Sequence, residues 1–283
     1  MYKVAIIGPG LLGASMAMAL RQRGDCLVAI WARRSESIVE AQEMGFADLA
    51  TTDLALAVQE ASIIVLCTPI GSMSVLARQL VPLISAEALI TDVGSVKGCV
   101  VTELGPIFKG HGRFVGSHPM AGSEQTGMKA ARADLFVDCT CVITPEESSE
   151  PRAVAELAVF WEGLGCRVHK TTPARHDEMV ALVSHFPHLL AASLVDMIAK
   201  KEPGAFALCG PGFRDTTRVA SGSAAMWTEI LRSNRDAVRN STEAMIEKLR
   251  EIVRLLDSGS PDHLMQEFLN QAKAQRDCLR LPR

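Results

Sequence analysis

Short apolar runs alternate with segments of helical apolar spacing along residues 1–172. The runs are rich in β-branched residues with few polar interruptions, which is typical of strands in a parallel sheet that is buried on both faces. Strands are predicted at residues 4–7, 26–31, 63–67, 89–93, 114–115, 137–143 and 166–169. Helices are predicted at residues 11–23, 35–44, 54–60, 75–84 and 152–164. This alternation predicts an α/β fold, a Rossmann-type doubly wound sheet over residues 1–172.

The pattern changes beyond residue 172, where no further strand is predicted. Residues 174–200 have helical spacing with Pro187 inside, so we expect a kink or a break there. The apolar positions of residues 227–256 predict one long amphipathic helix, and a last helix follows. Residues 173–283 are therefore predicted to form an all-α domain. Long amphipathic helices need another surface to cover their apolar faces, and a second copy of the chain could supply it.

A glycine pattern joins the first predicted strand to the first predicted helix. Gly8, Gly10 and Gly13 fit G-x-G-x-x-G. The first glycine permits a tight turn, the second lets a pyrophosphate approach the backbone, and the third lets the helix pack closely on the strand. The helix N-terminus at Leu11 and Leu12 supplies free N–H groups and partial positive charge for the phosphates. This strand–turn–helix context predicts a dinucleotide-binding site.

The end of the second predicted strand bears on the choice of cofactor. NAD-binding units usually carry an acidic residue there for the ribose 2′-hydroxyl. Here Ala32 takes that place, and Arg33, Arg34 and Ser35 follow. Two guanidinium groups and a hydroxyl suit a 2′-phosphate, which favours NADP over NAD. The alternative is that the two arginines are only solvated surface charges.

Other polar residues follow strands at the carboxyl edge of the predicted sheet, where ligands bind in this fold. Thr68 and Pro69 end one strand and Gly94 follows another, so they are predicted to contact the cofactor. If the strands are parallel, Ser95 and His118 emerge at the same edge, beside the nicotinamide. A neutral imidazole can accept a hydroxyl proton as hydride leaves the same carbon, and Ser95 can orient it. The alternatives are a helix N-cap for Ser95 and a turn histidine for His118.

The helical half carries a second group of candidate residues. Ser184, His185 and His188 crowd a helix that Pro187 interrupts. Metal binding there is disfavoured, because no third ligand is evident. Arg218 can clamp a substrate carboxylate bidentately, and the alternative is an ordinary surface ion pair.

Composition excludes several classes of protein. The formal net charge of −3 over 283 residues gives no reason to expect a nucleic-acid or membrane partner. No signal peptide is predicted, and no apolar run has the length of a membrane span. The 8 cysteines include no C-x-x-C pair, so we expect reduced thiols, a cytoplasmic location and no metal site.

The motifs together resemble the prephenate/arogenate dehydrogenases of tyrosine biosynthesis over nearly the whole chain. In chain order they are GPGLLGAS, VLCTPI, DVGSVK, GSHPMAGSEQTG, HDEMVALVSHFPHLLA and GFRDTTRVASGSAAMW. The resemblance implies oxidation of a cyclohexadienol with NAD or NADP and release of CO2. It also implies a homodimer formed through a helical domain that binds substrate, with tyrosine as an inhibitor of some members. We expect a monofunctional enzyme without chorismate-mutase or ACT segments.

The resemblance also implies roles for individual residues. His118 matches the catalytic histidine and Ser95 the serine near it. Arg218 matches the arginine that binds the substrate carboxylate, and His188 a histidine at the substrate side chain. Further site-lining positions fall on Ser184, Glu124 and Trp227, although composition alone places the tryptophan in the core.

Two other functions stay open at this point. One is a two-domain dehydrogenase of the β-hydroxyacid or imine reductase type, which usually relies on a catalytic lysine on a helix near the domain junction. This chain has His176, Ser184, His185 and His188 there instead, and Lys170 lies before that helix, at a strand end. The other is an NADP-binding sensor without chemistry, which would leave His118, His188 and Arg218 unexplained. The sequence does not decide between prephenate and arogenate.

Overall fold

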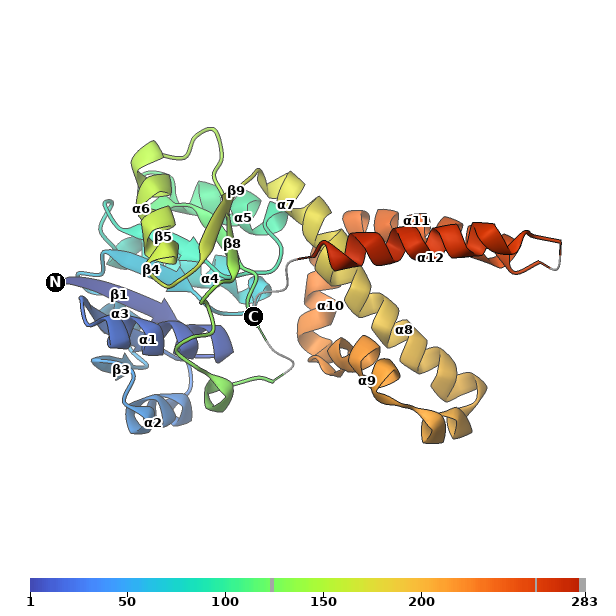
Figure 1. The fold of residues 1–283 in the computed structure, drawn as a ribbon. Helices are drawn as coiled ribbons and strands as arrows, with labels where there is room; N and C mark the ends of the chain where they lie inside the picture. Colours follow the sequence, from blue (N-terminus) through green and yellow to red (C-terminus); the bar gives the residue numbers. More distant parts are fainter. Residues whose placement is uncertain (123–124, 258, 280–283) are drawn as a thin grey trace.

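The computed structural model describes residues 1–122, 125–257 and 259–279. Figure 1 shows a sheet domain formed by the first part of the chain and a helical domain that projects from it. The main sheet has six parallel strands in the order β3-β2-β1-β4-β5-β6. They are β1 Tyr2–Ile7, β2 Cys26–Trp31, β3 Leu49–Thr51, β4 Ile63–Leu66, β5 Leu89–Asp92 and β6 Arg113–Phe114. The predicted doubly wound parallel sheet is confirmed.

Helices cover both faces of this sheet, which explains why its strands are apolar throughout. Val4 and Ile6 of β1 pack on one core and Ala5 and Ile7 on the other, because successive side chains point to opposite faces. One face carries α1 Leu11–Arg23, α2 Ser35–Met44 and α6 Pro151–Glu162. The other carries α3 Leu54–Val58, α4 Ile70–Leu80 and α5 Gly98–Phe108. Short 3₁₀ turns lie at η1 Val81–Leu83 and η2 Met128–Ala130.

A second, three-stranded sheet was not predicted. It contains β7 Gly116–Pro119, β8 Thr140–Thr144 and β9 Arg167–Lys170, with β7 antiparallel to β8 and β8 parallel to β9. The chain leaves the main sheet at Val115, whose N–H still donates to the Ile90 carbonyl, and Gly116 then pairs with Thr144. A side chain at Gly116 would lie 2.8 Å from Thr144 Oγ1 and 2.9 Å from Val101 Cγ2. Glycine therefore permits this crossing, and His118 lies within a strand of the second sheet instead of after a strand of the first.

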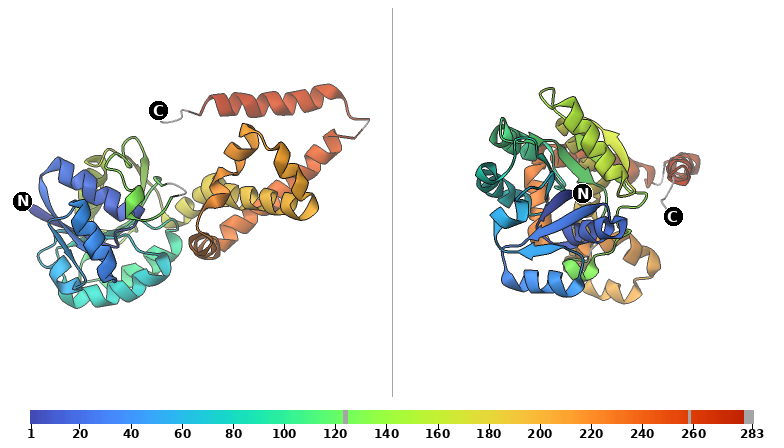
Figure 2. Two further views of the ribbon diagram at one scale, coloured as in Figure 1. Left: turned by 90° about the horizontal axis from the view of Figure 1, so that it is seen from below. Right: turned by 90° about the vertical axis from the view of Figure 1, so that its left-hand side faces the viewer.

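The helical domain is an elongated body whose helices extend away from the sheets (Figure 2). It contains α7 Pro173–Val180, the π-helical turn η3 Ala181–His185, α8 Phe186–Lys201, η4 Pro203–Leu208, α9 Pro211–Thr217, η5 Arg218–Ser221, α10 Ala224–Ser233, α11 Arg235–Leu255 and α12 Asp262–Asp277. The irregularity expected at Pro187 takes the form of η3, the turn that precedes it. Pro187 has no N–H to donate to the helix ladder.

The single long helix predicted over residues 227–256 is wrong. It is broken between α10 and α11 at Asn234, whose backbone leaves the helical region with φ −115° and ψ 30°. The Asn234 side chain explains the break, because its Nδ2 donates to the Asp177 carbonyl at 2.8 Å and contacts His185 Nδ1 at 3.1 Å. A buried polar contact with another helix thus overrides the apolar spacing.

The continuous helical stretch Pro173–Lys201 is long and apolar enough, by length and composition only, to cross a membrane. Of its most apolar window, 28% is buried inside the single chain. Several of its large apolar side chains are exposed, namely Leu182, Val183, Leu190 and Met197. The helical domain therefore presents an apolar surface that this chain alone does not cover.

Candidate active site

The glycine turn between β1 and α1 leaves room for a phosphate group. Gly8 adopts φ +106°, and a side chain there would lie 2.9 Å from the Cys67 carbonyl oxygen, so glycine is required. A side chain at Gly13 would overlap the Gly8 carbonyl oxygen, which keeps α1 close to the strand. Gly10 has no atom within 4 Å of the place where a side chain would start. The α1 N-terminus has no side-chain cap, so its N–H groups are available to an anion.

The edge beside this turn also carries unused polar groups. Thr68 Oγ1 is buried without a hydrogen-bond partner. Orphaned buried hydroxyl groups are rare in folded chains and often indicate a missing ligand or water. Together with the open glycine turn, Thr68 fits a dinucleotide at this edge, as the sequence predicts for Leu11, Leu12, Pro69 and Gly94.

The end of β2 is open to solvent around the predicted ribose site. Ala32 is buried, whereas Arg33, Arg34 and Ser35 are exposed. Arg34 Nη2 lies 3.4 Å from Ser37 Oγ, at the start of α2. Two guanidinium groups therefore flank a helix N-terminus next to the strand end, an arrangement suited to a phosphate.

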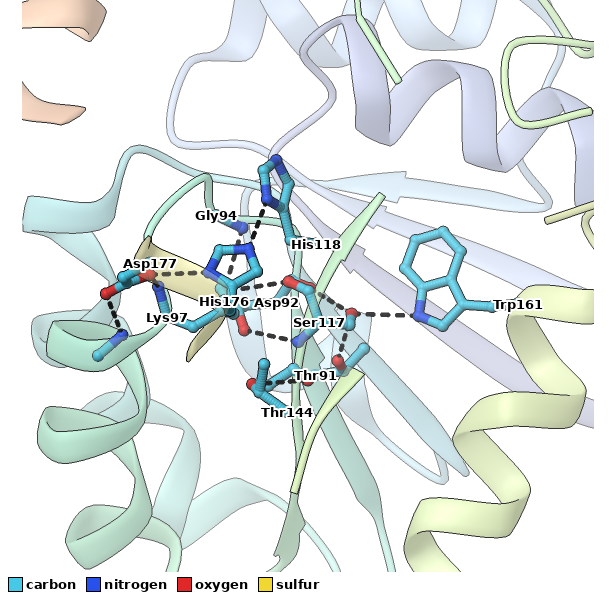
Figure 3. A network of polar contacts seen from close by, with 12 residues as sticks. Thr91, Asp92, Gly94, Lys97, Ser117, His118, Thr144, Trp161, His176 and Asp177 are labelled. Carbon is cyan, nitrogen blue, oxygen red and sulfur yellow. Dashed lines mark hydrogen bonds and ion pairs between the residues drawn. The ribbon is translucent and has the colours of Figure 1, made fainter. Parts of the chain in front are cut away.

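His118 lies in β7, where the sheet domain meets the helical domain, and it is 7% exposed. Its Nδ1 lies 2.9 Å from Nε2 of His176, which comes from α7 of the helical domain (Figure 3). Burial lowers the pKa of His118 well below its ordinary value, and unfavourable electrostatic interactions with the neighbouring His176, Lys97 and His185 lower it further. His118 is therefore neutral at pH 7 and can act as a base.

A buried polar network beneath His118 fixes β7 against the end of β5 (Figure 3). Lys97 and Asp92 form an ion pair with both side chains fully buried, and Lys97 Nζ also donates to the Ser117 carbonyl at 2.8 Å. Asp92 accepts from the Gly94 N–H at 2.8 Å and from the Ser117 N–H at 3.2 Å. The backbone N–H and carbonyl groups of Ser117, the residue before His118, therefore hold β7 against the end of β5.

The Ser117 side chain adds further hydrogen bonds, to β5 and to α6. Its Oγ donates to the Asp92 carbonyl at 2.6 Å and accepts from Trp161 Nε1 at 3.1 Å. Thr91 Oγ1 lies 2.8 Å from the same oxygen. Because these groups are buried and satisfied, they set the position of His118 firmly.

The helical domain contributes an aromatic and histidine cluster near the junction. The ring of His188 stacks on Trp227 with centroids 3.6 Å apart, and His185 lies edge-on to the same indole. His185 Nε2 and His188 Nδ1 are buried without hydrogen-bond partners. Burial lowers the pKa of His185 to about 4, so its ring is neutral. These two orphaned nitrogens are available to a polar ligand.

The remaining predicted residues lie at different depths. Ser184 in η3 is half-buried, and Arg218 lies on the exposed face of η5, which packs against α8. Within the described ranges no hydrogen bond joins Ser95 to His118, whose ring bonds to His176 instead. The Ser95 backbone acts on His185, whose pKa it raises against the effect of burial. Glu124 lies outside the described residues.

Sequence reasoning gave no role to Asp92, Lys97 and Asp177 of this site, and it placed His176 only among the histidines near the domain junction. The first two stand in the DVGSVK motif and the last two open HDEMVALVSHFPHLLA, so a signal was present in the blocks that carried the resemblance. Their partners, however, are far away along the chain, as with the Lys97 N–H and Asp177, which are 80 residues apart. Only the fold brings them together.

Comparisons with known proteins cover both domains. Residues 16–170 match the family model described as the prephenate dehydrogenase nucleotide-binding domain, and residues 172–270 match its dimerization domain. A cyclohexadienyl dehydrogenase from Zymomonas mobilis is 32% identical, with 96% of this chain and 94% of that protein covered.

Two solved structures have the same fold over almost all of the chain. A prephenate dehydrogenase from A. aeolicus, in complex with hydroxyphenyl propionate and NAD+, is 30% identical with a TM-score of 0.91 and covers 98% of this chain and 97% of its own. A Synechocystis arogenate dehydrogenase is 34% identical with a TM-score of 0.84 and covers 97% of this chain and 99% of its own.

Proposed function

The chain belongs to the prephenate dehydrogenase family, and on that premise we propose which of its residues carry out the oxidative decarboxylation of tyrosine biosynthesis. The substrate class is prephenate or arogenate, and the cofactor is a nicotinamide dinucleotide. Residues 1–172 form the nucleotide-binding domain, and residues 173–283 form the substrate-binding and dimerisation domain. The observation that supports this proposal most directly is that His118 is buried, neutral and located where the two domains meet.

His118 accepts the proton of the substrate's ring hydroxyl. When bound, the nicotinamide supplies the oxidation by taking up the hydride that leaves the same carbon. The resulting dienone is a vinylogous β-keto acid, so loss of CO2 restores an aromatic ring. General base catalysis of this kind contributes about 10²–10⁴-fold to a rate. Ser95, at the end of β5, is the hydroxyl that orients the substrate once it is bound.

The helical domain holds the substrate in place. Arg218 binds a carboxylate, because a guanidinium offers two parallel donors to its two oxygens. His188 and Trp227, stacked at 3.6 Å, face the substrate side chain, with Ser184 as a further lining residue. This positioning supplies proximity and charge stabilisation.

The competing dehydrogenase type needs a lysine at the reacting carbon. Lys97 is a lysine at this junction, but its ammonium group is fully buried and is bonded to Asp92 and to the Ser117 carbonyl. Lys97 therefore has a structural role, and the catalytic base is a histidine. A sensor without chemistry would leave the buried neutral base His118 at the domain junction unexplained.

Gly8, Gly10 and Gly13 and the N–H groups of Leu11 and Leu12 would hold the pyrophosphate. Thr68, Pro69 and Gly94 would line the nicotinamide end of the same edge. NADP is preferred over NAD, since Arg33, Arg34 and Ser35 replace the acidic residue that would bind a free 2′-hydroxyl.

Replacing Arg33 and Arg34 together by alanine tests the cofactor preference. Each charged contact with a phosphate contributes about 1.5–3 kcal/mol, so kcat/KM with NADP+ should fall at least tenfold while that with NAD+ stays within about threefold. Arg175→Ala, an exposed arginine of α7, is the control. Equal losses with both cofactors would show that the two arginines do not read the 2′-phosphate.

A second copy of the chain covers the apolar side chains exposed on η3 and α8. The alternative, a membrane, is disfavoured because the same stretch carries the histidines of the site and the ion pair of Asp196 with Lys200. Tyrosine inhibition and a cytoplasmic location stay predictions.

The overall function is tested by initial rates of reduced-nicotinamide formation in four combinations, prephenate or arogenate with NAD+ or NADP+. Turnover with either substrate is expected, fastest with NADP+. Intact nucleotide binding without turnover in any combination would contradict the proposed reaction.

A further inference from the structure

Asp177 lies at the centre of a set of hydrogen bonds whose direction is fixed. Its Oδ1 accepts from the Lys97 N–H at 2.7 Å and its Oδ2 from the Gly98 N–H at 2.8 Å, at the start of α5 (Figure 3). Backbone N–H groups can only donate, and the positive end of the helix favours a negative side chain there. Asp177 is therefore an ionised carboxylate that accepts every hydrogen bond it makes.

Because Asp177 only accepts hydrogen bonds, it determines which ring nitrogen carries the hydrogen in two histidines, His176 and His118. His176 Nδ1 lies 2.7 Å from Asp177 Oδ1, so it must carry a hydrogen and donate it. Burial lowers the pKa of His176, more strongly than its contact with Asp177 raises it, so the ring is neutral and its Nε2 has a lone pair. That Nε2 lies 2.9 Å from His118 Nδ1, which must then be the donor. The one remaining nitrogen, His118 Nε2, keeps its lone pair.

We propose that His176 and Asp177 are positioning residues that hold His118 with its hydrogen on Nδ1, which leaves Nε2 as the atom that accepts the substrate's hydroxyl proton. This inference rests on the proposed function, because it refines the role of His118 in that reaction. The substrate O–H bond breaks, and its proton forms a bond to Nε2 while the C–H electron pair leaves as hydride to the nicotinamide. The imidazolium that results still donates from Nδ1 to His176.

The same bonds couple the base to the contact between the two domains. His118, Lys97 and Gly98 belong to the sheet domain, whereas His176 and Asp177 belong to α7. Asn234, between α10 and α11, donates to the Asp177 carbonyl at 2.8 Å and so holds α7 from the other side. A displacement of the helical domain would therefore release the His118 ring from its hydrogen-bonding partner.

The charged and titratable groups around His118 do not offer it another partner for Nδ1. Lys97 is bonded to Asp92 and to the Ser117 carbonyl, and His185 is bonded to Asn234. Because the second nitrogen of a histidine is set by the bond of the first, loss of His176 or Asp177 frees His118 to adopt the opposite hydrogen position.

Nitrogen NMR of the unliganded protein with ¹⁵N-labelled histidine tests the hydrogen position directly. The signal of His118 is identified by its absence in His118→Asn, and the ring is observed at about pH 8, where histidine is neutral. We expect the hydrogen on Nδ1 in the wild type. In Asp177→Asn the side-chain amide can donate to His176, so we expect the hydrogen of His118 on Nε2. A hydrogen on Nε2 in the wild type would overturn the proposal.

Kinetics of the same variants supply the second readout. Asp177→Asn should lower kcat about 10²–10⁴-fold with KM changed little, as expected when a base is held in the wrong hydrogen position. The matched control is Asp196→Asn, at an exposed ion pair on α8, which should leave kcat unchanged. Equal kcat values for the two variants would overturn the proposal.

A pair of substitutions at His176 keeps the test valid if Asp177→Asn does not fold. Gln at this position can still accept from His118 Nδ1, whereas Leu of similar size cannot. We expect His176→Gln to retain at least tenfold more kcat than His176→Leu at equal melting temperature, and equal rates would overturn the proposal. If the wild type shows the expected hydrogen position but turns over neither substrate, the proposed function fails and the hydrogen-bond relay stands.

Discussion

The two halves of the candidate site are built in different ways. The phosphate-binding edge is formed by a short segment, Gly8 to Gly13, whose backbone shape does the binding. The base at the domain junction is held instead by side chains from β5, β7 and α7 and by Lys97 just before α5. The hydrogen bonds that join these elements connect residues between 20 and 80 positions apart along the chain. The first half depends on the absence of side chains and the second on a complete set of buried polar contacts. A substitution should therefore affect binding in one half and turnover or folding in the other.

The largest effect is expected from His118→Asn. Asparagine removes the base but keeps a polar side chain of similar length in β7, so kcat should fall about 10²–10⁴-fold while KM and the nucleotide Kd stay within about threefold. Steady-state kinetics and nucleotide titration measure the three quantities. A loss of nucleotide affinity equal to the loss of kcat would show that the two halves of the site are not separate.

The main effect of Lys97→Met should be a lower free energy of unfolding. The substitution leaves Asp92 as a fully buried carboxylate without its ion-pair partner, which costs about 3–5 kcal/mol. Denaturant unfolding measures this change, with Lys200→Met at an exposed pair as the control, where less than about 1 kcal/mol is expected. If both variants unfold alike, the buried pair does not hold β7 in place.

Two glycine substitutions should have smaller effects on the other half of the site. Gly10→Ala has open space around the new side chain, so the fold should be unchanged while nucleotide affinity drops roughly tenfold, because the phosphates can no longer approach the backbone. Gly13→Ala overlaps the Gly8 carbonyl and should also lower stability by about 1–3 kcal/mol. Calorimetric titration and thermal melting separate the two outcomes. Equal stability of both variants would contradict the described turn.

The sequence predicted what depends on local pattern. The doubly wound parallel sheet and the strand–turn–helix of the glycine pattern follow from apolar runs and glycine spacing, which a single segment carries, although the short edge strand β3 was not predicted. His118 was found because a histidine in a motif is visible by itself.

The sequence did not predict what depends on long-range contacts. The crossing to a second sheet at Gly116, the break at Asn234 and the pairing of His176 with His118 each require two distant segments to meet. Nothing in the local pattern distinguishes Asn234 from any other position of an amphipathic helix. Its role appears only once Asp177 and His185 lie beside it.

The pH dependence of kcat/KM tests most directly the claim that a buried neutral His118 is the base. Protonation removes the base, so activity is lost as the pH falls through the pKa of His118. Burial, and electrostatic interactions with His176, Lys97 and His185, place that pKa below the ordinary 6.5. We therefore expect a plateau that continues below pH 6.5 before the rate falls, and no such fall in the residual rate of His118→Asn. A fall already centred above pH 6.5, or the same fall in the variant, would show that His118 is not a buried neutral base in this reaction.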